Sequence, residues 1–227
     1  MTTVKDFLDD CPEQLAGYSR PDMATAAKVE PQRVDRFEER RRELADAALV
    51  TLSELGYART SLREIAQNSA FSHGVLHYYF RDKVDLITYC VRQYKAACVL
   101  RYDRIVATAR TPEGLAQGFA DGLVATLVED ARMHRLWYDL RSQALFEESF
   151  RADVLDIDAT LERMIDRIVG RYGELRDRPA PAPSAMTYAL FDGLFQQALL
   201  RHFAGSPTAA DDLRARVLGL LDRLFPP

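Results

Sequence analysis

The segment from Thr60 to Leu86 holds polar side chains at a spacing that suits contact with a nucleic acid. Ser61 stands three residues before Glu64, which is the pattern of a capping box at the start of a helix. Ser72 is a second helix-starting serine, and only Ser69-Ala70-Phe71 separate it from the preceding helix. Two short helices joined by so tight a turn form a helix-turn-helix, whose second helix lies in the DNA major groove. The segment therefore predicts a DNA-binding unit.

The patterns for other kinds of chemistry are incomplete. His73 and His77 are four residues apart, as two metal ligands on one helix face can be, but no third ligand is near in sequence, so we expect no metal. Cys90 and Cys98 fall in an apolar stripe, which predicts small buried residues, with redox sensing as the alternative. The chain has neither a G-x-S-x-G motif nor a phosphate-binding glycine loop, so we expect no enzyme activity and no cofactor.

Apolar residues recur at steps of three and four along almost the whole chain, and no stretch alternates as a strand does. This periodicity predicts an all-α protein of about nine helices. We divide it into an extension at 1–32, a three-helix helix-turn-helix domain at 33–80 and a larger helical effector-binding and dimerisation domain at 81–227. Pro21 and Pro31 are expected to break helical structure in the extension, which is then either mobile or packed on its own dimer.

Charge and hydropathy set further bounds on the class of protein. The 227 residues carry a net charge of −4, and 33–83 hold nine Lys or Arg against eight Asp or Glu, so charge alone does not indicate a nucleic acid. No apolar run reaches the roughly 18–20 residues that span a bilayer. The first ten residues hold three aspartates where a secretory signal has a basic and then apolar start. We expect a cytoplasmic protein with no membrane partner.

A set of residues in the first half of the chain keeps a distinctive order and spacing. The set consists of Leu44-Ala45-Asp46-Ala47-Ala48, Gly56-Tyr57, Thr60-Ser61, Ile65-Ala66, Ser72-x-Gly74-x-Leu76-x-x-Tyr79-Phe80, Lys83 and Leu86. Over these roughly 45 residues the chain resembles the N-terminal signature of TetR-type transcriptional repressors. The resemblance implies a ligand-responsive repressor that binds a pseudo-palindromic, double-stranded DNA operator.

The resemblance also implies which side chains meet DNA. By motif position they are Ser61, Arg63, Ser72, His73, Gly74 and His77, with Tyr78 and Lys83 on the flanking phosphates. Arg63 and His73 are the candidates for reading base edges. Ala70 stands where a turn glycine is usual, which predicts a strain on the order of 1 kcal/mol if that residue is left-handed, unless Asn68 or a reshaped turn relieves it. His77 replaces a common tyrosine, which would make DNA binding pH dependent.

The middle helices of this family enclose an effector cavity, and one segment of the chain suits such a cavity. Residues 133–141 are the richest mixture of aromatic and polar groups outside the helix-turn-helix. We expect walls from Tyr94, Phe119, Trp137 and Tyr138, with Asp139 or Arg141 as orienting polar groups. Because mostly apolar walls with few polar groups suit a small organic molecule, that is the expected effector. The alternative is that the aromatic residues belong to an ordinary core.

The last two expected helices, 184–203 and 209–225, predict a homodimer. The helix 184–203 is apolar on two sides. The core of one monomer covers only one of these sides, so the other side needs a partner. The expected interface residues are Phe191, Phe195, Leu199, Val217 and Leu221.

Two rival functions stay open from the residues. The first is a regulator of the same fold that activates transcription, or that senses a protein or a redox state. The second is a helical enzyme or scaffold that has retained the DNA-binding unit.

Overall fold

The computed structural model describes residues 30–57, 60–180 and 182–226, and the regular structure among them is entirely helical. The elements are α2 (Glu30–Leu55), α3 (Leu62–Gln67), α4 (His73–Tyr79), α5 (Lys83–Thr108), α6 (Pro112–Glu129), α7 (Ala131–Gln143), the 3₁₀ turn η1 (Glu148–Phe150), α8 (Arg151–Leu175), α9 (Ser184–Phe203) and α10 (Ala209–Leu224). For this part of the chain, the predicted all-α fold of about nine helices is confirmed. Residues 1–29 of the predicted extension lie outside the described residues.

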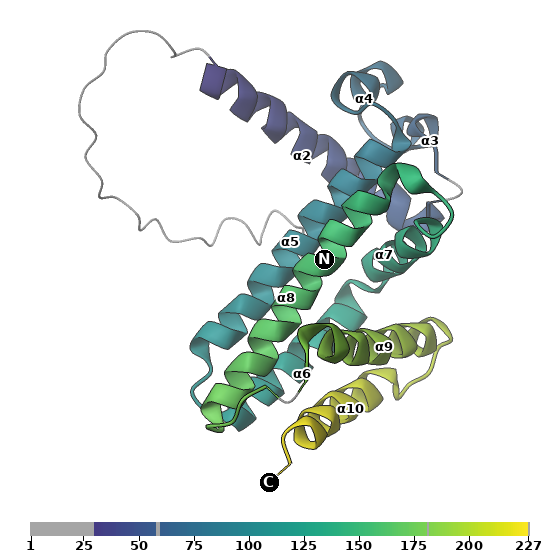
Figure 1. The fold of residues 1–227 in the computed structure, drawn as a ribbon. Helices are drawn as coiled ribbons and strands as arrows, with labels where there is room; N and C mark the ends of the chain where they lie inside the picture. The colour runs from purple at the N-terminus through teal and green to yellow at the C-terminus, as the bar shows by residue number, and fades with distance from the viewer. Residues whose placement is uncertain (1–29, 58–59, 181, 227) are drawn as a thin grey trace, which may run out of the picture.

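Helices α2, α3 and α4 form a head at one end of the molecule (Figure 1). Its interior holds Leu44, Leu52, Ile65 and Leu76, which all have 0% exposed surface. Helix α2 begins at Glu30, earlier than expected, so Pro31 lies in its first turn. A proline is tolerated there because the missing N–H has no partner within the helix.

Both helix N-caps that the sequence predicts in the helix-turn-helix are present. Ser61 accepts from the Glu64 N–H while the Glu64 side chain accepts from the Ser61 N–H, and Ser72 caps α4 through the Val75 N–H. The condition for strain at Ala70 is not met, because the only described non-glycine residue with positive φ is Asp177. Asn68 closes the turn instead: its backbone and side-chain N–H groups both donate to the Glu64 carbonyl, at 3.1 and 2.9 Å.

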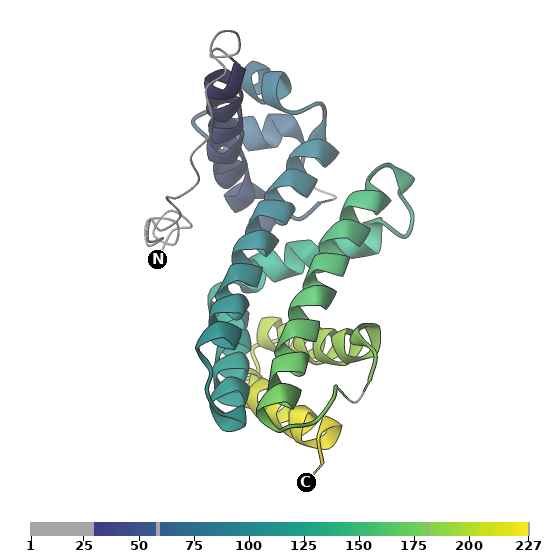
Figure 2. The ribbon, with the colours of Figure 1, turned by 60° about the vertical axis from the view of Figure 1, so that its left-hand side comes forward.

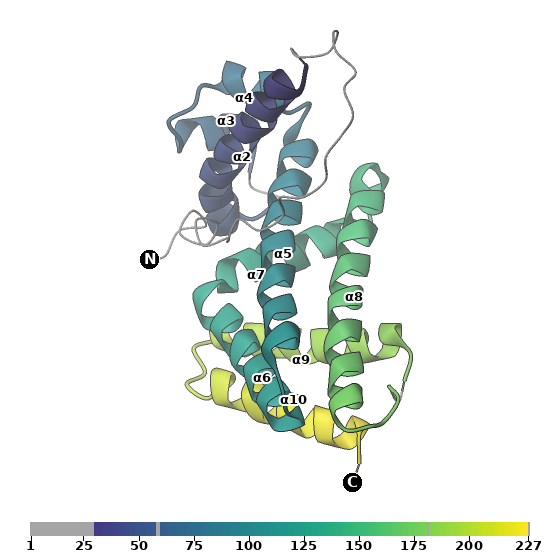
Figure 3. The same cartoon turned by 90° about the vertical axis from the view of Figure 1, so that its left-hand side faces the viewer.

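The remaining helices, α5 to α10, form a body below the head. Helix α5 runs from the head to the far end (Figure 2), with α8 beside it. Ion pairs join the two helices at both ends: Arg92 meets Asp153 at 2.6 Å, and Arg167 meets Asp103 at 2.7 Å. Helices α9 and α10 lie across the far part of the body, and α7 lies between the head and α9 (Figure 3).

The structure corrects the predicted dimer interface. The five expected residues are buried inside one monomer, with exposed fractions of 0–4%: Phe191, Phe195, Leu199, Val217 and Leu221. They pack there because α6 and α8 cover this side of α9 and α10. The opposite side of α9 is apolar and open, with Met186, Leu190 and Leu200 exposed.

Among the described residues, none of the helices combines the length and the apolar character that crossing a membrane requires.

Candidate DNA-binding surface and ligand cavity

Most of the predicted DNA-contacting residues share one exposed face of the head. Helix α4 is anchored from below by Leu76, which is fully buried. On its open side the exposed residues are Ser72, His73, Gly74, His77 and Tyr78, and α3 adds Ser61 and Arg63. In the described part of the chain, and apart from the neighbouring residues and the helix backbone, a Cβ added at Gly74 would meet within 4 Å only the Ser72 hydroxyl oxygen, at 4.0 Å, so a DNA backbone can approach closely here. The surface has the donors and the open backbone that a DNA groove requires.

The two histidines of α4 lie together on this surface. Their ring centroids are 4.4 Å apart and their planes are nearly perpendicular, at 82°. Among the described residues no cluster of three or more His, Cys, Asp or Glu could hold a metal ion. The arrangement therefore offers imidazole nitrogens to an external hydrogen-bonding partner such as a phosphate or a base edge.

Lys83, which is predicted to lie on a flanking phosphate, makes a contact inside the protein. Its ammonium donates to the Tyr57 carbonyl at 3.1 Å and lies 4.1 Å from the centre of the Tyr57 ring. The side chain thus joins the start of α5 to the turn that follows α2. Lys83 has a structural contact inside the protein, and it is only partly exposed.

The turn after α2 is also bound by α7. Gly56 adopts φ 77°, which glycine tolerates, and the Asp139 carboxylate approaches it and accepts from the Tyr57 N–H at 2.7 Å. Arg135, one turn earlier on α7, donates to the Ser53 and Glu54 carbonyls at 2.6 and 3.2 Å. Asp139 was expected to orient an effector, but the structure assigns its carboxylate to the junction between head and body.

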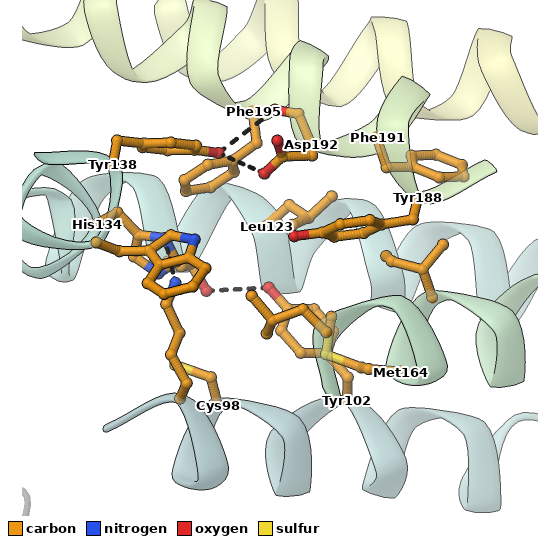
Figure 4. A pocket seen from close by; sticks show the side chains of 15 residues that line it. Cys98, Tyr102, Leu123, His134, Tyr138, Met164, Tyr188, Phe191, Asp192 and Phe195 are labelled. Carbon is orange, nitrogen blue, oxygen red and sulfur yellow. Dashed lines mark hydrogen bonds between the residues drawn. The ribbon is translucent and has the colours of Figure 1, made fainter. Parts of the chain in front are cut away.

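A cavity lies within the body, and we call it the central cavity (Figure 4). Its empty space is about 530 Å³, including the part that is open to solvent, and about 60 Å³ can hold the centre of a water molecule. Five helices contribute its lining: Lys95, Cys98, Tyr102, Leu123, Thr126, His134, Trp137, Tyr138, Leu161, Met164, Ile165, Tyr188, Phe191, Asp192 and Phe195. His134 and Tyr138 lie at one end of it, and Met164 and Phe191 at the other (Figure 4). The cavity therefore has a more polar end and an apolar end.

The polar end is built on a buried Lys95 and His134. The Lys95 ammonium lies 3.1 Å from His134 Nδ1. An ammonium can only donate, so His134 accepts at Nδ1 and carries its own proton on Nε2. Burial, and then the Lys95 charge, hold the pKa of His134 well below its usual value, which keeps the ring neutral. Among the described residues, His134 Nε2 and Trp137 Nε1 have no hydrogen-bond partner.

A second polar group in the cavity wall is already satisfied. The Asp192 carboxylate accepts from the Tyr138 hydroxyl at 2.9 Å and pairs with Arg141 at 2.7 Å. Arg141 also reaches Asp158, and Asp158 accepts from the Tyr188 hydroxyl at 2.6 Å. Burial, and then Asp192, raise the pKa of both tyrosines. Tyr138 and Tyr188 thus act as neutral donors that hold α7, α8 and α9 together.

The structure brings together part of the predicted effector site. Trp137 and Tyr138 line the central cavity, as expected. Tyr94 and Phe119 stand behind the lining, where Tyr94 meets the His134 ring and Phe119 meets the Phe191 ring. Arg141 is not part of the lining, but it pairs with the carboxylate of Asp192, which is. The prediction missed Lys95, although a lysine within the apolar stripe of Val91, Tyr94 and Cys98 was a signal for it.

The comparisons with known proteins agree with this architecture. The model of the family "Bacterial regulatory proteins, tetR family" matches residues 44–90. The HTH-type transcriptional regulator BetI of Escherichia coli is 27% identical over 186 residues, covering 79% of this chain and 89% of that protein. A TetR transcription regulator from Haloarcula marismortui aligns with a TM-score of 0.68 at 19% identity, over 82% of this chain and 98% of that one. FadR from Bacillus subtilis in complex with stearoyl-CoA aligns with a TM-score of 0.62 at 17% identity, over 79% of this chain and 96% of that one. Residues 44–90 therefore match a TetR-type DNA-binding unit, and the chain is similar to TetR-family transcriptional regulators in its head and in its helical fold.

Proposed function

We propose that the protein is a cytoplasmic, homodimeric repressor that binds a pseudo-palindromic DNA operator and leaves it when a small organic effector fills the central cavity. The observation that carries this proposal is the position of α7. One side of this helix lines the cavity through His134, Trp137 and Tyr138. The other side binds the head through Arg135 and Asp139.

This arrangement supplies a route from ligand to DNA. A molecule in the cavity contacts α7 directly, and a shift of α7 moves the two hydrogen-bonded anchors of the turn after α2. Since α2 packs on α3 and α4, the orientation of the DNA-contacting face follows that turn. The effector lowers DNA affinity only as far as it binds the released state more tightly than the DNA-bound state. The solved FadR complex, whose ligand is stearoyl-CoA, supports ligand binding within this fold.

The open face of α9 supports a homodimer. Met186, Leu190 and Leu200 are 57%, 42% and 73% exposed, at steps that place them on one side of the helix. Gly193 lies between them, and among the described residues no atom outside its own helix backbone lies within 4 Å of the position of an added Cβ, so a second helix can come close. An apolar face of this kind on a helix whose other side is already buried fits a second copy of the same helix. Two heads can then reach successive major grooves about 34–36 Å apart.

Selection of bound sequences from a random DNA pool, followed by anisotropy titrations at fixed salt, tests the DNA-binding part. We expect a twofold-symmetric sequence to be enriched. Arg63→Ala should weaken binding to it by about 1–3 kcal/mol and relax preference at one position of each half-site. Arg163→Ala, an exposed arginine on α8, is the matched control. Absent or sequence-independent binding by the wild-type protein would refute the proposal.

A further inference from the structure

The polar end of the central cavity holds a positive charge that the protein does not neutralise. Lys95 is 3% exposed, and among the described residues none of the carboxylates lies within 4.0 Å of its ammonium. Its one hydrogen-bond partner there is the neutral ring of His134. Asp192, the carboxylate in the cavity lining, is already taken by Tyr138 and Arg141. Burying a charge without a counter-ion is costly, so this end of the cavity favours an incoming anion.

The unsatisfied polar atoms at this end all point to the same chemistry. His134 Nε2 carries a proton because Nδ1 faces the ammonium, and Trp137 Nε1 is a donor by its structure. Lys95 has two further N–H bonds beyond the one directed at His134. The unpaired groups of the cavity lining are thus donors, so a ligand that satisfies them must supply acceptor atoms. The unpaired Tyr94 hydroxyl, which can donate or accept, stands behind the lining. An amine or another cation would leave these donors unpaired and add a like charge beside Lys95.

The rest of the cavity limits the remainder of the ligand. Away from Lys95 the wall is apolar, with Leu123, Leu161, Met164, Ile165 and Phe191. The volume open to water centres is small, at about 60 Å³. Such a cavity suits a compact apolar group attached to one charged end. Met164 is the unbranched, adaptable side chain in this wall and can change its conformation to admit a somewhat larger group.

We infer that the effector is a small organic carboxylate, whose acid group pairs with Lys95 and accepts from His134 and Trp137 while its apolar body fills the end of the cavity near Met164. This inference rests on the proposed function, because it names the ligand class of the same cavity. It assigns Lys95 as the specificity-determining residue. At neutral pH the pKa of Lys95, which burial lowers to about 8, still leaves the amine mostly protonated.

Matched pairs of acids and amides test the inference without any DNA. Benzoate, phenylacetate and 3-methylbutanoate are each titrated against the corresponding neutral amide by calorimetry on the full-length protein. Charge-assisted hydrogen bonds in a desolvated site lead us to expect a preference for the acid on the order of tenfold to a hundredfold. Lys95→Met, which keeps an unbranched apolar stem, should abolish the preference. Arg92→Met removes an exposed cation from the same helix and should preserve it.

The outcomes separate the inference from the proposed function. If none of the three acids binds, if the amides bind equally well, or if the acid preference persists in Lys95→Met, the inference is wrong. The wild-type comparison of acid with amide stands by itself if the variant does not fold. Acids that bind through Lys95 but do not release operator DNA would support the ligand class and overturn the release mechanism.

Discussion

The Asp139 carboxylate on α7 accepts a hydrogen bond from the backbone N–H of Tyr57 at 2.7 Å, and this bond joins the head to the body. The Tyr57 carbonyl in the same peptide segment accepts from Lys83 at 3.1 Å. The Tyr57 ring packs on Phe150, with centroids 5.5 Å apart. One residue of the turn after α2 is therefore held by three parts of the body: α7, α5 and η1. Of these, α5 and α7 also line the central cavity.

Asp139→Ala should reduce the coupling between ligand and DNA. Removing an acceptor from a partly buried backbone N–H should lower the free energy of unfolding by about 1–2 kcal/mol. The ratio of DNA affinities without and with bound acid should fall toward one, while acid affinity of the free protein stays the same. Asp139→Asn keeps an oxygen that can accept and is the matched control. An unchanged ratio in Asp139→Ala, measured by anisotropy titration, would exclude this bond as a carrier of the signal.

Glutamates on the open face of α9 should split the dimer. The double variant Leu190→Glu and Leu200→Glu places charges in an apolar contact, so light scattering should report a folded monomer. Its operator affinity should drop by about two orders of magnitude or more, because one head reads only half a site. Leu100→Glu, on an exposed position of α5, should stay dimeric. A double variant that remains a dimer with full DNA affinity would place the interface elsewhere.

The buried residues of α9 and α10 should behave differently from that face. Val217→Glu introduces a charge at a position with 0% exposure, so it should unfold the protein rather than yield a folded monomer. Circular dichroism during thermal unfolding separates the two outcomes. A folded monomer of Val217→Glu would contradict the burial of this helix within one protomer.

The buried amine of Lys95 should make stability depend on pH. Burial lowers its pKa from 10.5 to about 8, so between these values the unfolded chain binds more protons than the folded one. Stability then rises with pH across this window. Relative to Lys95→Met, the free energy of unfolding of the wild type should increase by on the order of 3 kcal/mol from pH 8 to 10.5. The titratable and charged groups around the amine, which are His134, Cys98, Asp192, Arg141 and Asp130, are the same in both proteins. Urea unfolding at several pH values measures the difference, and a flat difference would contradict it.

The two described cysteines should be inert in the folded protein. Burial raises the pKa of both Cys90 and Cys98, so little thiolate forms at neutral pH. A disulfide reagent should modify them at least about a hundredfold more slowly in native buffer than in denaturant. Mass spectrometry of the modified peptides assigns each site. Rapid native modification of Cys98, which lines the cavity, would favour the rival hypothesis of a redox sensor.

Short-range features of the head could be predicted because their causes act within a few residues. The capping box at Ser61 and Glu64 and the cap at Ser72 depend on a hydroxyl and an amide three positions away. The resemblance added the residues of the DNA-contacting face, and seven of the eight are exposed there. Lys83 is the exception, because its partner is the backbone of Tyr57, which lies 26 residues earlier in the chain.

Long-range packing decided what periodicity left open. The stripes on α9 look alike in sequence, since both repeat apolar residues at three- and four-residue steps. Only the placement of α6, α8 and α10 buried the side with Phe195 and left Leu200 exposed. In the same way, nothing local distinguishes Asp139 from Asp192 as a cavity residue. The first faces the turn after α2 and the second faces Tyr138, because α7 lies between the head and α9, and that position is a property of the assembled fold.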